Sequence, residues 1–121
     1  RVRNHFGVNR LGQVAALAAL ADQNWLHDVR ARIVASRERI AGIARNQGFE
    51  PIPSATNFVT VDCGRDAAYA KALLDGLVSR GVFIRMPGVA PLNRCIRIST
   101  GPAVELDIFE RVLADTVSAL G

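Results

Sequence analysis

The sequence has little of what most recognisable active sites are built from. Its 121 residues include 2 cysteines, 2 histidines, 1 tryptophan, 1 tyrosine and 1 methionine. Cys63 and Cys95 lack metal-ligand spacing, and neither His5 nor His27 has a suitably spaced ligating partner. We therefore predict no metal site, and we expect both thiols to be free and buried.

Signals for nucleophilic catalysis and for membranes are missing as well. The sequence has no G-x-S-x-G motif, and Ser36, Ser79 and Ser118 fall on the surfaces of expected helices, so no catalytic triad is predicted. Lys71, the only lysine, lies on the side of its helix away from the leucines, which is typical of a solvated side chain rather than a Schiff base. There is no signal or transit peptide pattern and no apolar run of about 18 residues. We expect no membrane partner and a cytoplasmic location.

The positive charge does not have the pattern of a nucleic-acid interface. The formal net charge is only +4, although all the basic residues except Lys71 are arginine. The densest basic run consists of Arg30, Arg32, Arg37 and Arg39. It shares its helix with two acids and has no interleaved aromatic residues. This pattern indicates a solvated helix face, and we predict no nucleic-acid partner.

Length and periodicity favour one α+β domain over residues 1–121, with a small, mostly antiparallel sheet and helices packed on one side. The alanine-rich apolar run predicts a short buried helix, and a longer amphipathic helix follows it until Gly48. Three strands and two more helices complete the pattern. The expected helices are 11–21, about 26–44, 67–80 and 103–120, and the expected strands are 57–62, 82–85 and 94–99.

An arginine interrupts the last expected strand, in the stretch "CIRIST". Successive side chains in a strand alternate between its faces, so Ile96 and Ile98 share the core face while Arg97 lies on the other. That face could simply meet water, as one face of an antiparallel sheet often does. Alternatively, the guanidinium could bind a planar anion.

A second arginine is expected beside the first. If the strands 82–85 and 94–99 pair, Arg85 and Arg97 can project toward one anionic ligand. Two neighbouring arginines repel, so something negative should lie close to them. Internal candidates are acids of the chain, namely Asp62, Glu105 and Asp107; the external candidate is a carboxylate or phosphate ligand.

Two polar residues at element ends have ordinary structural interpretations. Thr100 is the expected N-cap of the last helix, with Pro102 in its first turn. Asn57 opens the first expected strand, where its amide could bond the backbone locally or face a ligand.

Four segments in this order resemble the C-terminal third of the fold-type I, pyridoxal-phosphate-dependent aminotransferases, and most closely their histidinol-phosphate aminotransferase branch. The resemblance covers nearly the whole sequence. The segments are "FGVNRLGQVAALAALAD", "SATNFVTVD", "RGVFIRM" and "CIRISTG".

The resemblance implies roles for three residues in substrate binding. In this family the arginine that corresponds to Arg97 binds the substrate carboxylate, the one that corresponds to Arg85 lies near the distal group of the substrate, and the asparagine that corresponds to Asn57 lies at the active-site edge of the small domain. The implied substrates are amino acids and keto acids. Two departures are Met86, where histidinol-phosphate enzymes often have aspartate, and the loop "PGVAPLNR".

The resemblance also implies which functional residues of the family this sequence lacks. The family's Schiff-base lysine and its other pyridoxal phosphate ligands belong to a large domain upstream, so we expect no catalytic and no cofactor-binding residue here, and an inactive fragment. Because the sequence opens on Arg1 without methionine, we expect it to be the C-terminal part of a longer homodimeric enzyme. Residues 1–24 would then be a connecting segment and short helix from the large domain. The alternatives are a free-standing small-anion-binding or regulatory module and a purely structural domain.

Overall fold

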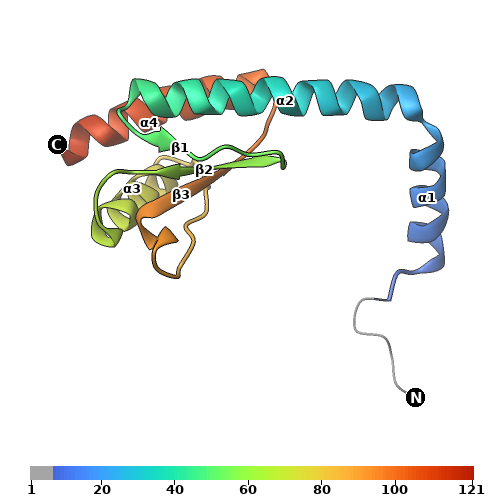
Figure 1. Ribbon diagram of the computed structural model, residues 1–121, viewed down its shortest axis with the longest axis horizontal. Helices are drawn as coiled ribbons and strands as arrows, with labels where there is room; N and C mark the ends of the chain where they lie inside the picture. The colour runs from blue at the N-terminus through green and yellow to red at the C-terminus, as the bar shows by residue number, and fades with distance from the viewer. Residues whose placement is uncertain (1–6) are drawn as a thin grey trace, which may run out of the picture. The chain divides into compact units, whose positions relative to one another are not determined.

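The computed structural model describes residues 7–121, which form four α-helices and a three-stranded sheet (Figure 1). The chain divides into two compact units, Arg1–Arg32 and Ile33–Gly121. The first contains α1 (Arg10–Ala21) and the start of α2 (Gln23–Asn46). The second contains the rest of α2 and every other element: β1 (Glu50–Pro51), β2 (Phe58–Asp62), α3 (Ala67–Ser79), a short 3₁₀-helix (Leu92–Arg94), β3 (Cys95–Ser99) and α4 (Ala103–Leu120).

The sheet of the second unit is antiparallel throughout, in the order β1-β2-β3. The main register pairs Val59 with Ile98 and Val61 with Ile96. These four side chains are buried and lie on the same face of the sheet, because residues two apart in a strand share a face. The α+β class and the antiparallel sheet predicted from the sequence are confirmed.

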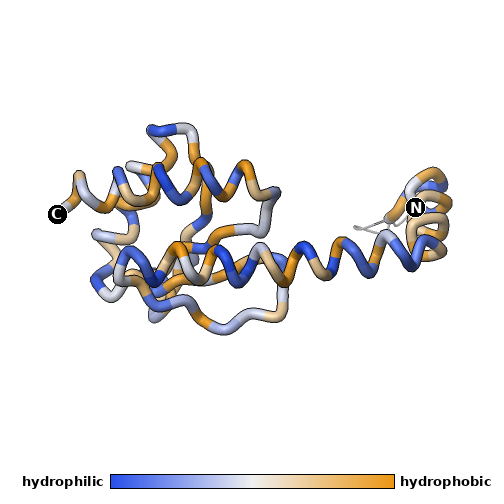
Figure 2. Tube along the Cα trace, turned by 90° about the horizontal axis from the view of Figure 1, so that it is seen from above, coloured by the Kyte–Doolittle hydropathy of each residue, from blue (hydrophilic) through white to orange (hydrophobic). Residues whose placement is uncertain are grey.

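All three helices of this unit contribute to the hydrophobic core on that face. The cluster combines side chains of α2, α3 and α4 with those of β2 and β3. Its most completely buried large members are Ile40, Leu73, Leu77, Ile96, Leu113 and Val61. Figure 2 shows hydrophobic and hydrophilic residues alternating along α2, which is the pattern of a helix with one face on a core.

Helices α2 and α4 are also linked by polar contacts. Arg39 forms ion pairs with Asp107 and Glu110 of α4, and these carboxylates raise the pKa of its guanidinium. The hydroxyl of Ser36 donates to the carbonyl of Gly101 and accepts from its N–H. The prediction that Ser36 lies on a helix surface is wrong, because this pair of bonds to the segment before α4 buries the side chain. Ser79 and Ser118 are exposed, as predicted.

Helix ends follow the local sequence at several points. The Asp66 side chain accepts from the N–H of Tyr69 and caps α3. Gly48 and Gly81 follow α2 and α3 with positive φ angles of 77° and 81°, the left-handed conformation that glycine adopts without strain. Thr100 is not the N-cap that the sequence predicted, because its hydroxyl donates to the Asn57 carbonyl and Pro102 occupies the cap position.

Two sheet elements differ from the prediction. Strand β1 was not predicted, because it has two residues and includes Pro51, and proline is expected only at sheet edges. The strand predicted over 82–85 is wrong for residues 82–84. The N–H of Val82 still bonds the Leu77 carbonyl at the end of α3, so the chain reaches the sheet only at Arg85, which forms an isolated bridge with Arg97.

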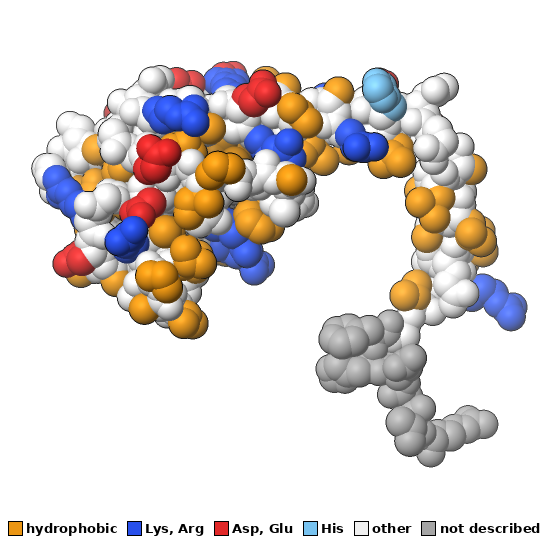
Figure 3. Space-filling view, in the orientation of Figure 1, with side chains coloured by type: hydrophobic (Ala, Val, Ile, Leu, Met, Phe, Trp, Pro, Cys, Tyr) orange, Lys and Arg blue, Asp and Glu red, His pale blue; other side chains and the backbone are white. Residues whose placement is uncertain are grey.

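Helix α1 belongs to the first unit and has no buried residue among those described. The prediction of a buried helix is therefore wrong for the unit as described. Four leucine and valine side chains of α1 are more than half exposed, and Figure 3 shows hydrophobic side chains gathered along this helix. They are Leu11, Val14, Leu17 and Leu20.

Gly76 is required where α3 and α4 approach each other. A Cβ atom on Gly76 would lie 2.6 Å from Cγ2 of Thr116, closer than packed atoms come. We expect Gly76→Ala to lower the free energy of unfolding by about 1–3 kcal/mol, although alanine favours helices by about 1 kcal/mol. Urea denaturation followed by circular dichroism measures this.

The matched background is Thr116→Ser, which removes Cγ2 but keeps the hydroxyl that donates to the Val112 carbonyl. In that background Gly76→Ala should be neutral or stabilising. An equal loss of stability in both backgrounds would show that the contact with Cγ2 is not the cause.

Candidate functional site

The face of the sheet opposite the core carries polar side chains, and we call it the outer face. It is formed by alternate residues of β2 and β3, together with Arg85. Its members are Phe58, Thr60, Asp62, Arg85, Cys95, Arg97 and Ser99.

Arg85 and Arg97 lie directly opposite each other on this face. The Arg85 N–H donates to the Arg97 carbonyl at 3.1 Å, and the Arg97 N–H donates to the Arg85 carbonyl at 2.7 Å. Such a doubly bonded antiparallel pair places both side chains on the same side of the sheet. The predicted antiparallel pairing of the two segments is therefore confirmed at this bridge, with Thr60 opposite Arg97 on its other side.

Two of the acids proposed as internal partners, Asp62 and Asp107, are paired with other arginines. Asp62 forms an ion pair with Arg94, and Asp107 forms one with Arg39. Within residues 7–121, no carboxylate forms an ion pair with Arg85 or Arg97. Two guanidinium groups thus share one face on which the acid Asp62 is paired with Arg94, so their N–H donors remain available to an external anion.

Asn57 is linked to β3 through its backbone. Its carbonyl accepts the N–H of Thr100 at 2.9 Å and the Thr100 hydroxyl at 3.1 Å. The residue is exposed and precedes the first residue of β2. These bonds fix the end of β3 against the start of β2, and the predicted role of the Asn57 side chain in ligand binding stays a prediction.

The loop between Arg85 and β3 has apolar side chains in solvent. Val89 is 77% exposed, and Phe83, just before Arg85, is 79% exposed. Three glycine and proline residues interrupt the loop, and its Ala90–Pro91 peptide bond is cis. The chain thus exposes apolar side chains both before and after Arg85.

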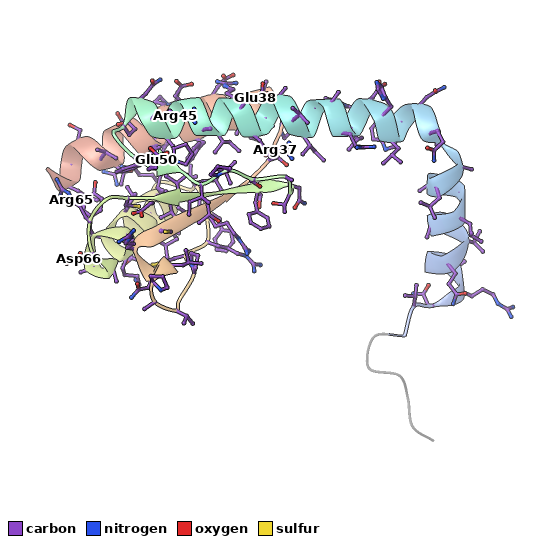
Figure 4. The ribbon with its side chains drawn as sticks, viewed as in Figure 1. Arg37, Glu38, Arg45, Glu50, Arg65 and Asp66 are labelled. Carbon is purple, nitrogen blue, oxygen red and sulfur yellow. The ribbon has the colours of Figure 1, made fainter. Side chains whose placement is uncertain are left out.

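A groove of about 290 Å³ lies between α2 and the segment after β1. Arg37, Glu38 and Arg45 of α2 line one wall, and Figure 4 labels these three along the helix. Arg37 donates to the Thr56 carbonyl. The groove contains none of the three predicted site residues.

The lysine and histidine side chains form no further candidate site among the described residues. Lys71 is on the surface of α3 and pairs with Asp75, as expected of a solvated lysine. His27 is exposed, and His5 lies outside the described residues. In the part of the chain that the structure describes, no group of His, Cys, Asp and Glu residues could hold a metal ion, and no helix is long and apolar enough to cross a membrane.

Both cysteines are free and buried, which confirms the prediction. Burial raises the pKa of the Cys63 thiol to about 11, with smaller contributions from Cys95 and Asp62. Burial also raises the pKa of the Cys95 thiol, and the negative charge of Asp62 raises it further by a smaller amount. Both thiols therefore stay protonated near neutral pH and are poor nucleophiles.

This predicts slow thiol modification in the folded chain. At about pH 8, a thiol with a pKa near 11 has about 100-fold less thiolate than one near 9, so Cys63 should react with a disulfide reagent at least about 100-fold more slowly than in urea. The folded thiol also keeps its proton where the unfolded one loses it, so the free energy of unfolding should fall as the pH rises from about 9 to 11. Absorbance of the released thiolate measures the first effect, and urea titrations measure the second. Equal rates in buffer and in urea would contradict this account.

A second prediction concerns Arg94, whose Nε and Nη2 atoms lie 2.9 Å and 2.7 Å from one carboxylate oxygen of Asp62. Asp62 and Arg97 are diagonal neighbours on the outer face, within reach of a long side chain. Arg94→Ala should free Asp62 to pair with Arg97. If an anion binds the Arg85–Arg97 pair, this change should weaken its binding about threefold to tenfold, which calorimetry with inorganic phosphate measures. Asp62→Asn in the same background should restore it. Unchanged binding in Arg94→Ala would show that Asp62 does not compete for Arg97.

The family model described as "Aminotransferase class I and II" matches residues 1–114. The chain belongs to the aminotransferase class I and II family. Among curated relatives it is 40% identical over 109 residues to histidinol-phosphate aminotransferase 2 of Methylococcus capsulatus, a match that covers 90% of the chain and 29% of that relative.

Solved aminotransferase structures agree with this assignment. A crystal structure of histidinol-phosphate aminotransferase from Sinorhizobium meliloti, in complex with pyridoxal-5'-phosphate, superposes with a TM-score of 0.93 at 57% identity, over 99% of this chain and 33% of that one. A putative aminotransferase from Burkholderia pseudomallei superposes with a TM-score of 0.79 at 30% identity, over 95% of this chain and 34% of that one. The chain thus spans about a third of the length of these relatives.

The structure also places residues at the candidate site that the sequence did not single out. The ring of Phe58 lies under the guanidinium of Arg97, and Arg94 engages the acid closest to the arginine pair in register. Alternation along β2 puts Phe58 on the same face as Thr60, which was the available signal for its position. The contact between Phe58 and Arg97 depends on the register between the two strands, which the sequence does not specify.

Proposed function

We propose that this chain is the substrate-binding small domain of a pyridoxal-phosphate-dependent aminotransferase of the histidinol-phosphate aminotransferase type. The observation that supports the proposal most directly is the pair of Arg85 and Arg97 on the outer face, without an acid partner among the described residues. In this proposal Arg97 binds the substrate carboxylate through paired N–H donors. Arg85 binds the distal anionic group, and Asn57 borders the pocket.

The described residues do not fit the cofactor itself. Pyridoxal phosphate needs a lysine amine for its aldehyde, and the only lysine is 59% exposed and paired with Asp75. We therefore propose that the cofactor, the lysine and the proton-transfer steps belong to the other two-thirds of the enzyme, and that this chain alone is inactive. The proposal includes a cytoplasmic, homodimeric enzyme acting on amino acids and keto acids.

Calorimetric titration of the chain with glutamate and with inorganic phosphate tests the binding role. We expect weak binding, with a dissociation constant on the order of 1 mM, that is lost in Arg97→Ala. The matched control is Arg80→Ala, because within residues 7–121 the Arg80 guanidinium bonds only the Gly76 carbonyl of its own helix.

Two results would contradict the proposal. Binding unaffected by Arg97→Ala would place the anion elsewhere, with the groove beside Arg37 and Arg45 as the next site to test. Micromolar binding of a small anion by the chain alone would instead favour a free-standing anion-binding module.

A further inference from the structure

Arg97 has an aromatic ring as its neighbour and no carboxylate partner among the described residues. Its guanidinium carbon lies 4.8 Å from the centroid of the Phe58 ring, well within the range of about 6 Å for a cation–π contact. Arg39 and Arg94, by contrast, each form ion pairs with carboxylates. The environment of Arg97 therefore attracts the cation without neutralising it.

Strand register creates this contact. Thr60 lies opposite Arg97, and Phe58 lies opposite Ser99, so Phe58 is the diagonal neighbour of Arg97 on the outer face. Diagonal neighbours are about 7–8 Å apart at the backbone, a distance that a long arginine side chain spans. Between β2 and β3, the residues opposite Arg97 and Phe58 are Thr60 and Ser99, whose small side chains leave room for the guanidinium to reach the ring.

The Phe58 side chain is not part of the hydrophobic core. Its alternate neighbours Val59 and Val61 belong to the core cluster, whereas Phe58 is neither a member of that cluster nor packed against it among the described residues. Its carbonyl accepts the hydroxyls of Ser54 and Thr56, and these bonds do not depend on which side chain it carries. The ring is thus free to serve the face where Arg97 lies.

We propose that Phe58 is a positioning residue for Arg97, with its ring holding the guanidinium in place so that the N–H donors remain available to the substrate carboxylate. This inference rests on the proposed function of Arg97. A ring face interacts with the flat side of a guanidinium, whereas the N–H donors point outward in its plane. An acid in the place of the ring would occupy those donors and cancel the charge.

The test uses the intact aminotransferase that contains this chain, with steady-state kinetics for an amino-acid donor. Phe58→Leu should raise KM about fivefold with kcat little changed, because substrate and transition state lose the same contact to an ordered arginine. Phe58→Trp should keep KM at or below that of the unsubstituted enzyme, since tryptophan offers the better ring. Phe58→Met is a second variant without a ring, for use if Phe58→Leu does not fold.

A double-mutant cycle separates positioning from general destabilisation. In the Arg97→Ala background, Phe58→Leu should change KM less than about 1.5-fold, because no guanidinium remains to be held. Tyr69→Leu is the matched control, since Tyr69 lies under Arg65 at 4.4 Å in a cation–π contact outside the candidate site. It should leave KM unchanged even where it lowers the melting temperature.

The outcomes distinguish this inference from the function on which it rests. A normal KM in Arg97→Ala overturns the proposed function. A raised KM in Arg97→Ala, together with a normal KM in Phe58→Leu, overturns the positioning role alone. The positioning role is also wrong if Phe58→Leu raises KM by the same factor with and without Arg97, or if Phe58→Trp behaves like Phe58→Leu.

Discussion

Arg97→Ala should raise the KM of the intact aminotransferase for its carboxylate substrates about 100-fold, since a charged group that pairs with a guanidinium typically contributes about 2–5 kcal/mol. The physical reason is the position of Arg97 opposite Arg85, where the backbone bonds of the sheet hold it without an acid partner among the described residues. Steady-state kinetics with glutamate as the donor measures the change. Arg97→Lys keeps the charge but loses the paired donors, and it should cost about tenfold.

Selectivity for the carboxylate provides the internal control. For a donor amine that lacks the carboxylate, Arg97→Ala should change KM little, because the lost partner is absent from the substrate. Arg80→Ala should behave like the unsubstituted enzyme for both donors, since among the described residues the Arg80 guanidinium bonds only its own helix. A KM within about twofold of normal in Arg97→Ala would exclude Arg97 as the carboxylate anchor.

Leu73→Ala should lower the free energy of unfolding by about 3–5 kcal/mol, the upper part of the range for leucine truncation in a core. Leu73 is completely buried in α3 and belongs to the cluster that joins the sheet to the helices. The domain has a single sheet face on which to build its core, so little of the cavity can be filled by rearrangement. Urea denaturation of the chain, followed by circular dichroism, measures the loss.

Leu17→Ala is the matched control for Leu73→Ala, because it deletes the same atoms from a helix position that is 69% exposed. It should change the free energy of unfolding by less than about 0.5 kcal/mol. A large loss in Leu17→Ala would mean that α1 buries this side chain in solution, for instance against a second copy of the chain. A small loss in Leu73→Ala would contradict the packing described for α3.

Helix and strand positions followed largely from local patterns. The predicted bounds of the last helix, 103–120, match α4, and Asp66 caps α3 as its side chain predicts. Alternation in "CIRIST" correctly placed Ile96 and Ile98 in the core. Two local predictions failed because of a distant partner: Ser36 is buried by Gly101, and Thr100 bonds Asn57 rather than capping a helix.

By itself, the sequence determined the fold class, the core face of the sheet and the presence of two arginines on neighbouring segments, because periodicity and capping are local properties of the chain. The family resemblance also followed from it, and the match over residues 1–114 bears that out. Only the tertiary structure decided that Arg97 faces Arg85 directly, that Asp62 is engaged by Arg94, and that Phe58 lies under Arg97. These contacts depend on strand register and on competition between side chains far apart in sequence, and a shift of one residue in register would change every one of them.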